Sequence, residues 1–179
     1  MIGQHKRNFE LVPYQSEWTD HFVQEAEQIR SALGDKALQI EHVGSTSIPG
    51  MAAKPVIDIM VAVETLNRSS ELMLTLDEIG YDYFPLDTVP DRLFFARELQ
   101  PEIRTHHLIL AQKESEFWKN QLLFRDYLRE DDELASEYVQ IKKEFAEYYA
   151  RINHLDREWK SEFVAKVLKM ANSDSLAAR

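Results

Sequence analysis

The sequence contains no cysteine. This absence excludes a disulfide scaffold, a thiolate nucleophile and a zinc site built on thiolate ligands. The sequence also has no run of about 18 apolar residues, the length that a membrane-spanning helix needs, and no secretory signal is recognised at its start. We therefore expect a soluble, cytoplasmic protein with no membrane partner.

Basic residues are in short supply as well. The 21 lysines and arginines are outnumbered by 31 acidic residues, and the formal net charge is −10. A broad nucleic-acid surface gathers Lys and Arg to displace the counterions of the phosphate backbone, so this balance argues against one. A local pocket for a small anion stays compatible with it. The cations nearest the motifs described below are Lys54, Arg92, Arg97, Arg104 and Arg125.

Two well-known phosphate loops are missing. Five residues separate Gly44 from Gly50 and Met51 follows the second glycine, so the Walker A pattern G-x-x-x-x-G-K-[ST] is not met. The dinucleotide pattern G-x-G-x-x-G does not occur either. The sequence therefore supports neither a P-loop kinase nor a Rossmann fold.

The most informative segment is residues 41–63, EHVGSTSIPGMAAKPVIDIMVAV, in which a glycine turn, three hydroxyl side chains, a lysine and a carboxylate follow in close succession. Gly44 tolerates unusual backbone angles, and the hydroxyls and amides that follow it can surround an anion. Residues 51–54 are expected to make about one helical turn before Pro55, which would hold Lys54 near the next strand. The residues predicted to bind phosphate at this turn are His42, Gly44, Ser45, Thr46, Ser47 and Lys54. Alternatively, the hydroxyls only cap a short helix.

The strand predicted over residues 56–63 carries one charged residue, Asp58. Alternation places Asp58 on one face with Val56, Met60 and Ala62. An unpaired buried carboxylate costs several kcal/mol, so Asp58 should have a partner or lie at an open rim. A metal ion, a phosphate-bound Mg²⁺ or Mn²⁺, or an ion pair with Lys54 or Arg104 would each satisfy it.

A second strand is predicted over residues 105–111, THHLILA. Alternation puts His107 on the opposite face from His106, so one of the two should face Asp58. We assign that place to His107, as a general base, a phosphate donor or a metal ligand, and interpret His106 as a packing residue. If His42 converged on Asp58 and His107, the three would form a 2-His-1-carboxylate site for a transition metal.

The remaining patterns predict an α+β protein. Helices are expected over residues 14–33 and 69–79, and strands over residues 37–43, 56–63, 81–84, 92–99 and 105–111, in a mixed sheet of about four or five strands. Three helices, over residues 115–129, 132–151 and 154–171, should form a C-terminal helical layer. We expect a single domain over residues 1–179, with its core at about 12–170.

The motifs EHVGSTSIPG, AAKPVIDI, RTHHL and FRDYLR, with a weaker match at residues 14–18, resemble those of the GrpB family across roughly residues 12–170. Members of that family look like divergent nucleotidyltransferases. The resemblance implies a Gly-Ser turn at Gly44 and Ser45, a first metal-binding acid at Asp58, and phosphate contacts from Arg104 and Arg125. The family's second acid would stand at position 60, which is methionine here.

The resemblance implies a protein that binds a phosphorylated ligand, a nucleotide with a divalent metal, and that transfers a nucleotidyl group to an unknown acceptor. The alternative is a non-catalytic module for a nucleotide or phosphometabolite, since a thioether at Met60 does not ligate Mg²⁺ well. Related chains occur fused to dephospho-coenzyme A kinase, so a coenzyme A-related ligand belongs to this alternative. A third reading is an interaction protein whose motif only holds the sheet together.

Overall fold

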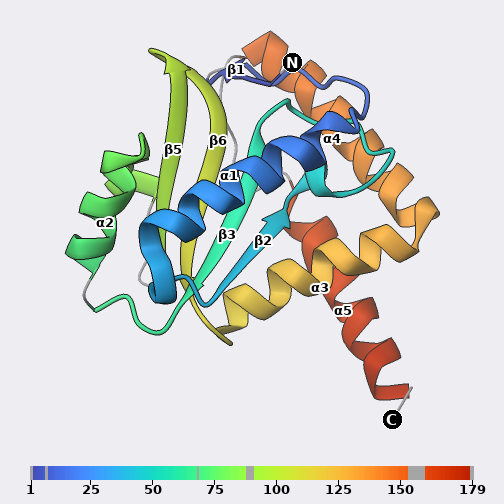
Figure 1. The fold of residues 1–179 in the computed structure, drawn as a ribbon. Helices are drawn as coiled ribbons and strands as arrows, with labels where there is room; N and C mark the ends of the chain where they lie inside the picture. The colour runs from blue at the N-terminus through green and yellow to red at the C-terminus, as the bar shows by residue number, and fades with distance from the viewer. Residues whose placement is uncertain (1, 7, 68, 88–90, 153–159, 178–179) are drawn as a thin grey trace.

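The computed structural model describes residues 2–6, 8–67, 69–87, 91–152 and 160–177. These residues form a six-stranded mixed sheet with helices on both faces (Figure 1). The strands are β1 (Gln4–His5), β2 (Gln39–Val43), β3 (Ile57–Val63), β4 (Asp82–Tyr83), β5 (Arg92–Gln100) and β6 (Ile103–Gln112). The α-helices are α1 (Glu17–Leu33), α2 (Ser69–Glu78), α3 (Glu116–Glu130), α4 (Asp132–Ile152) and α5 (Ser161–Ala177). Within these ranges no helix has the length and apolar character needed to cross a membrane.

The strand order is β2-β3-β6-β5-β4, with β1 paired to the start of β6. The β3 and β6 strands run parallel, whereas the other strand pairs are antiparallel. The predicted α+β class is therefore confirmed. The sheet has six strands because the two residues of β1, which lie before the expected core, add to it. The parallel register sets Asp58 directly beside His107.

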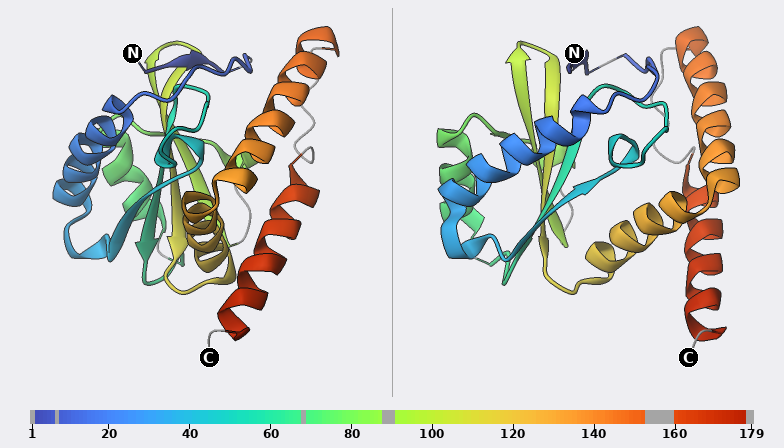
Figure 2. Two further views of the ribbon diagram at one scale, coloured as in Figure 1. Left: turned by 90° about the vertical axis from the view of Figure 1, so that its right-hand side faces the viewer. Right: turned by 45° about the vertical axis from the view of Figure 1, so that its right-hand side comes forward.

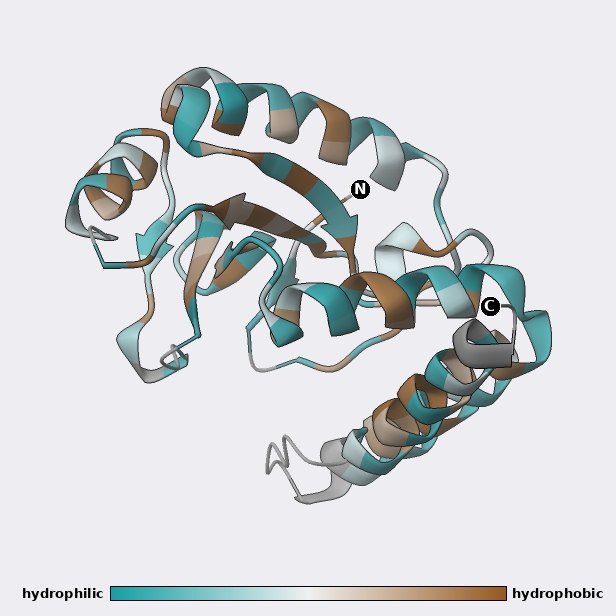
Figure 3. Ribbon diagram, turned by 90° about the horizontal axis from the view of Figure 1, so that it is seen from below, coloured by the Kyte–Doolittle hydropathy of each residue, from teal (hydrophilic) through white to brown (hydrophobic). Residues whose placement is uncertain are grey.

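The two faces of the sheet are covered by different helices, as the view in Figure 3 shows for α1 and α3. Ile57, Ile59 and Val61 of β3 join the core under α1 and α2. Met60 and Ala62 belong to a smaller apolar cluster with Trp118 of α3. The predicted alternation along β3 is confirmed, and Asp58 lies on the α3 face.

The first helix begins at Glu17, three residues later than predicted, and ends at Leu33, as predicted. Gly34 adopts a φ of 56°, and its N–H donates to the carbonyl of Arg30. The apolar stripe of α1 contributes fully buried Trp18 and Ile29 to the core. Glu25 is buried in the same stripe, a position that the apolar pattern did not reveal.

The C-terminal helices form the expected layer, with α4 and α5 standing as one column beside the sheet in both views of Figure 2. Tyr138 of α4 stacks on Phe163 of α5 with 5.0 Å between the ring centroids. Both rings pack with Leu128 of α3 and Ile48 of the Gly44 turn. The third predicted helix begins at residue 154, and residues 153–159 lie outside the described residues. Leu155 and Trp159, which belong to its apolar face, are among them.

One local prediction is wrong. Residues 51–54 do not form a helical turn. Instead, Ala53 forms a bridge with Val12, in which each N–H donates to the other residue's carbonyl, at 2.9 and 3.0 Å. The backbone groups that a helical turn would have used are satisfied by the segment before α1. Lys54 consequently lies between this bridge and Pro55, just before β3.

Candidate functional site

The Gly44 turn and the Asp58 carboxylate touch. Gly44 has a φ of 69°, and a Cβ added to it would lie 2.4 Å from Oδ2 of Asp58. A side chain at position 44 would therefore meet both an unfavourable backbone conformation and a steric clash. The turn can approach the carboxylate this closely only because residue 44 is glycine.

The three hydroxyls of the turn have different roles. Ser47 Oγ donates to the carbonyl of Gly44 at 2.6 Å, and Thr46 Oγ1 is 2.9 Å from Nε2 of His42. Both residues are buried, so their hydroxyls maintain the turn. Ser45 and Thr46 also line a hollow, and there Ser45 Oγ is contacted by Lys142.

His42 lies away from the other two predicted metal ligands. Its ring stacks on Phe22 of α1 at 4.7 Å between centroids and contacts Thr46. Burial lowers the pKa of His42 to about 4, so the ring is neutral at physiological pH. Within the described part of the chain, no three His, Asp or Glu side chains are arranged to hold a metal. The hypothesised set of His42, Asp58 and His107 is not assembled.

Asp58 and His107 form a direct pair. Nδ1 of His107 lies 2.9 Å from Oδ1 of Asp58, and the two side chains are 24% and 36% exposed. A carboxylate only accepts, so Nδ1 carries the donated proton, and in the neutral ring Nε2 is the acceptor. The alternative ion pairs are not formed: Lys54 Nζ lies over the ring of Phe9, and the nearest carboxylate of Arg104 is that of Glu98, at 3.6 Å.

Met60 is closed to any ligand. It is fully buried among Val43, Ala62 and Trp118. Its cross-strand neighbour Glu41 is engaged by Arg125 at 2.5 Å. Among the described residues, Asp58 is the one carboxylate in the lining of the hollow beside the turn, a set that fits one Mg²⁺ held largely by phosphate oxygens and water. It does not fit a two-metal centre.

A hollow of about 130 Å³ lies between the turn, β3 and α4, and we call it the turn hollow. Both Ser45 and Asp58 line it. Lys54 and His107 line it as well. The helical layer adds Tyr138 and Lys142 of α4, together with Lys160 just before α5. The turn hollow therefore holds three lysines around one carboxylate.

Lys142 was missed by the sequence pattern. Its Nζ donates to Ser45 Oγ at 3.1 Å and to the carbonyl of Ala52 at 2.6 Å, and the side chain is buried. Burial, with a smaller contribution from Lys160, lowers the pKa of Lys142 to about 7. Nothing in the sequence QIKKEF distinguishes this lysine from its exposed neighbour Lys143, because its position depends on a turn 97 residues earlier in the chain.

The FRDYLR motif holds the turn in place. Arg125 donates to Glu41 and to the carbonyl of His42, while Asp126 binds its remaining side. Arg129, which the sequence analysis did not single out, donates to the carbonyl of Ser47 at 2.8 and 3.1 Å. The two arginines therefore clamp the backbone on either side of Gly44. Since two carboxylates neutralise Arg125, we assign it to positioning the turn.

His106 lies on the other face, beneath α1. Its ring lies 4.0 Å from Glu25, which is also paired with Arg97 at 2.6 Å. Burial lowers the pKa of His106 to about 4 and raises that of Glu25. The interpretation of His106 as a packing residue agrees with this enclosed position.

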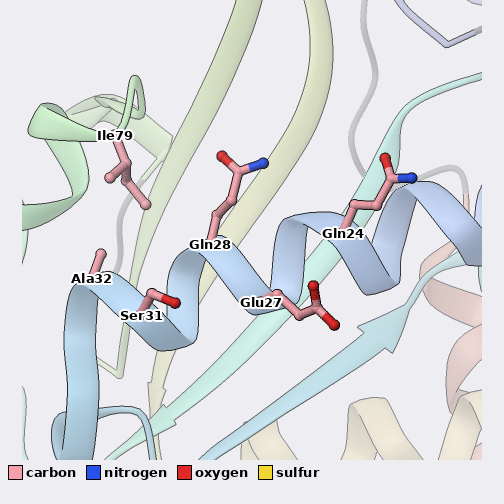
Figure 4. Close-up of a pocket in the computed structure, with 6 residues that line it drawn as sticks. All are labelled: Gln24, Glu27, Gln28, Ser31, Ala32 and Ile79. Carbon is pink, nitrogen blue, oxygen red and sulfur yellow. The ribbon is translucent and has the colours of Figure 1, made fainter.

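Two further hollows adjoin the turn hollow. One of about 380 Å³ shares Ser45, Tyr138 and Lys160 with it and extends between α3 and α5. The other, of about 490 Å³, shares Lys54, His107 and Lys160 and contains Arg104. A separate hollow of about 790 Å³ runs along α1 and reaches Ile79 (Figure 4). Its lining carries no cation, so it is not a candidate for anion binding.

Known proteins resemble this chain in both sequence and fold. The GrpB protein family model matches residues 8–170. A UPF0157 protein of Pseudomonas aeruginosa is 36% identical over 167 residues, which are 90% of this chain and 67% of that protein. The crystal structure of GrpB from Enterococcus faecalis superimposes with a TM-score of 0.82 and 32% identity, over 93% of this chain and 99% of the other.

More distant likenesses concern parts of other proteins. The Cid1 poly(U) polymerase bound to MgATP aligns with a TM-score of 0.53 and 12% identity, over 73% of this chain and 43% of the polymerase. This likeness shows the fold alone. A dephospho-CoA kinase of Mycolicibacterium paratuberculosis is 42% identical over 74 residues, 40% of this chain and 18% of the kinase. On the evidence of the family match and its relatives, the chain belongs to the GrpB family and has a nucleotidyltransferase-like fold.

Proposed function

We propose that this protein binds a nucleoside triphosphate with its phosphates in the turn hollow and transfers the nucleotidyl group to an acceptor hydroxyl. The observation that carries the proposal is the convergence of Ser45, Lys142, Asp58 and His107 on that one hollow. These residues come from the turn, α4, β3 and β6. The likeness in fold to a polymerase bound to MgATP supports the nucleotide as the ligand.

The phosphates would be held by the turn and the helical layer together. The Gly44 turn offers the Ser45 hydroxyl, and Lys142 already donates to that hydroxyl. Lys54 and Lys160 line the same space, so a polyphosphate would meet three lysines. Charge-assisted hydrogen bonds of this kind are about twice as strong as neutral ones. An anion would also offset the cost of burying Lys54, whose pKa is lowered by burial.

Asp58 and His107 would act on the acceptor. Asp58 fixes the ring of His107 through Nδ1 and leaves Nε2 to take a proton. In the proposed step the acceptor oxygen bonds to the α-phosphorus, its proton passes to Nε2, and the bond to the bridging oxygen breaks as pyrophosphate leaves. Asp58 would also hold one Mg²⁺ on the phosphates, where the ion neutralises charge.

The second candidate is a binding module without transfer. Its support is Met60, fully buried in an apolar cluster where the family pattern would place a second acid. In that case the ligand is a nucleotide or a phosphometabolite, and the partial likeness to dephospho-CoA kinases favours testing coenzyme A precursors. The same residues would bind the phosphates in both cases.

A thermal-shift series tests binding. ATP, CTP, GTP, UTP and coenzyme A precursors are each added with and without Mg²⁺ or Mn²⁺, and a ligand at a hundred times its Kd should stabilise the fold by about 2.7 kcal/mol. Ser45→Ala should lose most of that stabilisation. Ser31→Ala, at the remote α1 hollow, is the matched control and should keep it.

Pyrophosphate release then separates the two candidates. Release that depends on His107, tested with His107→Gln, supports transfer. Ligand stabilisation without release supports the binding module. If no nucleotide or precursor stabilises the protein, or if Ser45→Ala binds as well as the unaltered chain, the site is assigned wrongly.

A further inference from the structure

The hollow of about 490 Å³ beyond His107 gathers positive charge in an acidic protein. We call it the basic hollow. Its lining comes from β1, the Phe9 segment, the residues just before β3, β5, β6 and the residue before α5. The cations in it are Lys6, Lys54, Arg92, Arg104 and Lys160. One carboxylate, that of Asp87, is found among the described lining residues. Because the chain carries a net charge of −10, the gathering of five Lys and Arg side chains around one hollow is a specific feature of the fold.

Two of these cations lack a close anionic partner, whereas Lys6 is paired with Glu102 at 3.1 Å and Arg92 with Asp91 at 2.7 Å. Lys54 and Lys160 make no ion pair within the described residues, although Lys54 lies over the ring of Phe9. Arg104 approaches Glu98 only to 3.6 Å, and its buried Nε–H donates no hydrogen bond to the rest of the described chain. A buried donor without a partner is unfavourable, and an anion bound to this guanidinium would offset that cost.

Aromatic rings fix the guanidinium of Arg104. Its centre lies 4.3 Å from the ring centroid of Phe84 and 5.9 Å from that of Phe94. Phe94 in turn lies 5.2 Å from the ring of His107. Arg104 is therefore held against one wall of the basic hollow, beside the histidine that is paired with Asp58.

His107 joins this hollow to the turn hollow, because it lines both, whereas Asp58 lines only the turn hollow. The Nδ1 side of the ring is directed at Asp58. A molecule in the basic hollow would therefore meet the histidine ring on one side, with the phosphates in the turn hollow beyond it. This is the arrangement that two substrates of one transfer reaction require.

We propose that the basic hollow binds the phosphate group of a small phosphorylated acceptor, whose hydroxyl lies at His107. Its volume is within the usual range for small-molecule sites, roughly 300–1,000 Å³. A polynucleotide acceptor is disfavoured by the net charge of the chain and by the carboxylates of Asp87 and Glu102 near the same surface. The role as acceptor site rests on the proposed function, whereas the binding of a phosphate group does not.

Calorimetric titration of the full chain with inorganic phosphate tests the inference. The titration is done first on the free protein and then with a saturating non-hydrolysable ATP analogue and Mg²⁺. Phosphate should bind in both cases, because Arg92 and Arg104 line only the basic hollow, although the two hollows share Lys54 and Lys160. Arg104→Gln should weaken phosphate binding about tenfold and leave the affinity for the analogue within about twofold, since one charge-assisted hydrogen bond accounts for a change of this size.

Two further variants keep the test decisive if Arg104→Gln folds poorly. Arg92→Gln, at the edge of the same hollow and away from the turn, should weaken phosphate binding about threefold. Arg30→Gln, on the exposed side of α1, is the matched control and should change nothing. Circular dichroism of each variant establishes that the fold is intact.

The outcomes distinguish this inference from the proposed function. Phosphate that is displaced by the analogue, or that binds equally well to the Arg104 and Arg92 variants, overturns the acceptor site and leaves nucleotide binding untouched. If the analogue fails to bind while phosphate binding depends on Arg104 and Arg92, the basic hollow stands as an anion site and the nucleotide proposal fails. Binding of both, each weakened by its own variants, supports both.

Discussion

Two adjacent histidines on β6 experience opposite environments. His106 lies under α1, 4.0 Å from a Glu25 that also binds Arg97. His107 lies on the α3 face, 2.9 Å from an Asp58 whose side chain is 36% exposed. Each histidine has a carboxylate neighbour, yet one group is sealed in the core and the other opens into a hollow. The presence of a His–carboxylate pair therefore does not define a site; access to it does.

The closed and open environments also coexist on one face. The cluster of Val43, Met60 and Trp118 seals the α3 side of β3, and two residues before Met60 the strand opens at Asp58. Substitutions on either side of this boundary should therefore have very different consequences for the free energy of unfolding.

The largest effect is expected from Met60→Asp. The new carboxylate would be fully buried among apolar side chains, so the free energy of unfolding should fall by about 4 kcal/mol in urea titrations. Met60→Leu conserves the volume and should cost less than about 1.5 kcal/mol. A Met60→Asp variant that is as stable as its parent and gains Mg²⁺ affinity would instead indicate a decayed transferase whose second acid can be restored.

The next effect comes from breaking the closed pair under α1. Arg97→Met should lower the free energy of unfolding by about 3 kcal/mol, because Glu25, only 4% exposed, would be left without its cation. Glu25→Leu combined with Arg97→Met should recover much of this loss. Nucleotide and phosphate binding should be unchanged in every case, and altered binding would link the closed face to the site.

Lys142 provides a pH test of the helical layer. The pKa of Lys142 is about 7 in the folded chain against 10.5 for an ordinary lysine, so between these values the unfolded chain binds more protons. The free energy of unfolding should therefore rise with pH, by about 2 kcal/mol from pH 7 to pH 9. The rise should be absent in Lys142→Met, measured by urea titration at each pH. Lys143→Met, the exposed neighbour, should retain it; equal slopes in both variants would show that Lys142 does not titrate there.

The smallest effect on stability is expected at the open pair. Asp58→Asn should change the free energy of unfolding by less than about 1 kcal/mol, because the pair is partly solvated. Asp82→Asn, at an exposed position, sets the baseline. A loss at Asp58 as large as that of Arg97→Met would make the open pair a structural one and remove the contrast between the two faces.

Much of this arrangement followed from local pattern. The branched run of β3 predicted a strand with Asp58 on one face, and the alternation over residues 105–111 separated His106 from His107. The helix α1 ends at Leu33 as expected, and the next residue, Gly34, has a φ of 56° that only a glycine adopts at little cost. Periods of two and of 3.6 residues are properties of the chain itself, so they can be predicted from the sequence alone.

What escaped prediction depends on where distant elements meet. Lys142 and Arg129 look like solvated charges in their helices, and both are drawn to the Gly44 turn, 97 and 82 residues away. The sequence indicates an exposed position for Glu25, whereas in the fold Glu25 is buried and paired with Arg97 of β5. The helical turn predicted at residues 51–54 is absent for the same reason, because the backbone groups of Ala53 are hydrogen-bonded to Val12 instead. Tertiary pairing outweighed local propensity in each case.

Arg125 and Arg129 grip carbonyl oxygens on both sides of Gly44, so the loop is rigid before anything binds to it. Ordering the backbone of one residue costs roughly 1–2 kcal/mol in conformational entropy. Here that entropy is lost when the protein folds and not when a ligand binds. The turn is therefore preorganised, and its affinity for a ligand should depend on the contacts that the ligand makes rather than on the cost of ordering the loop.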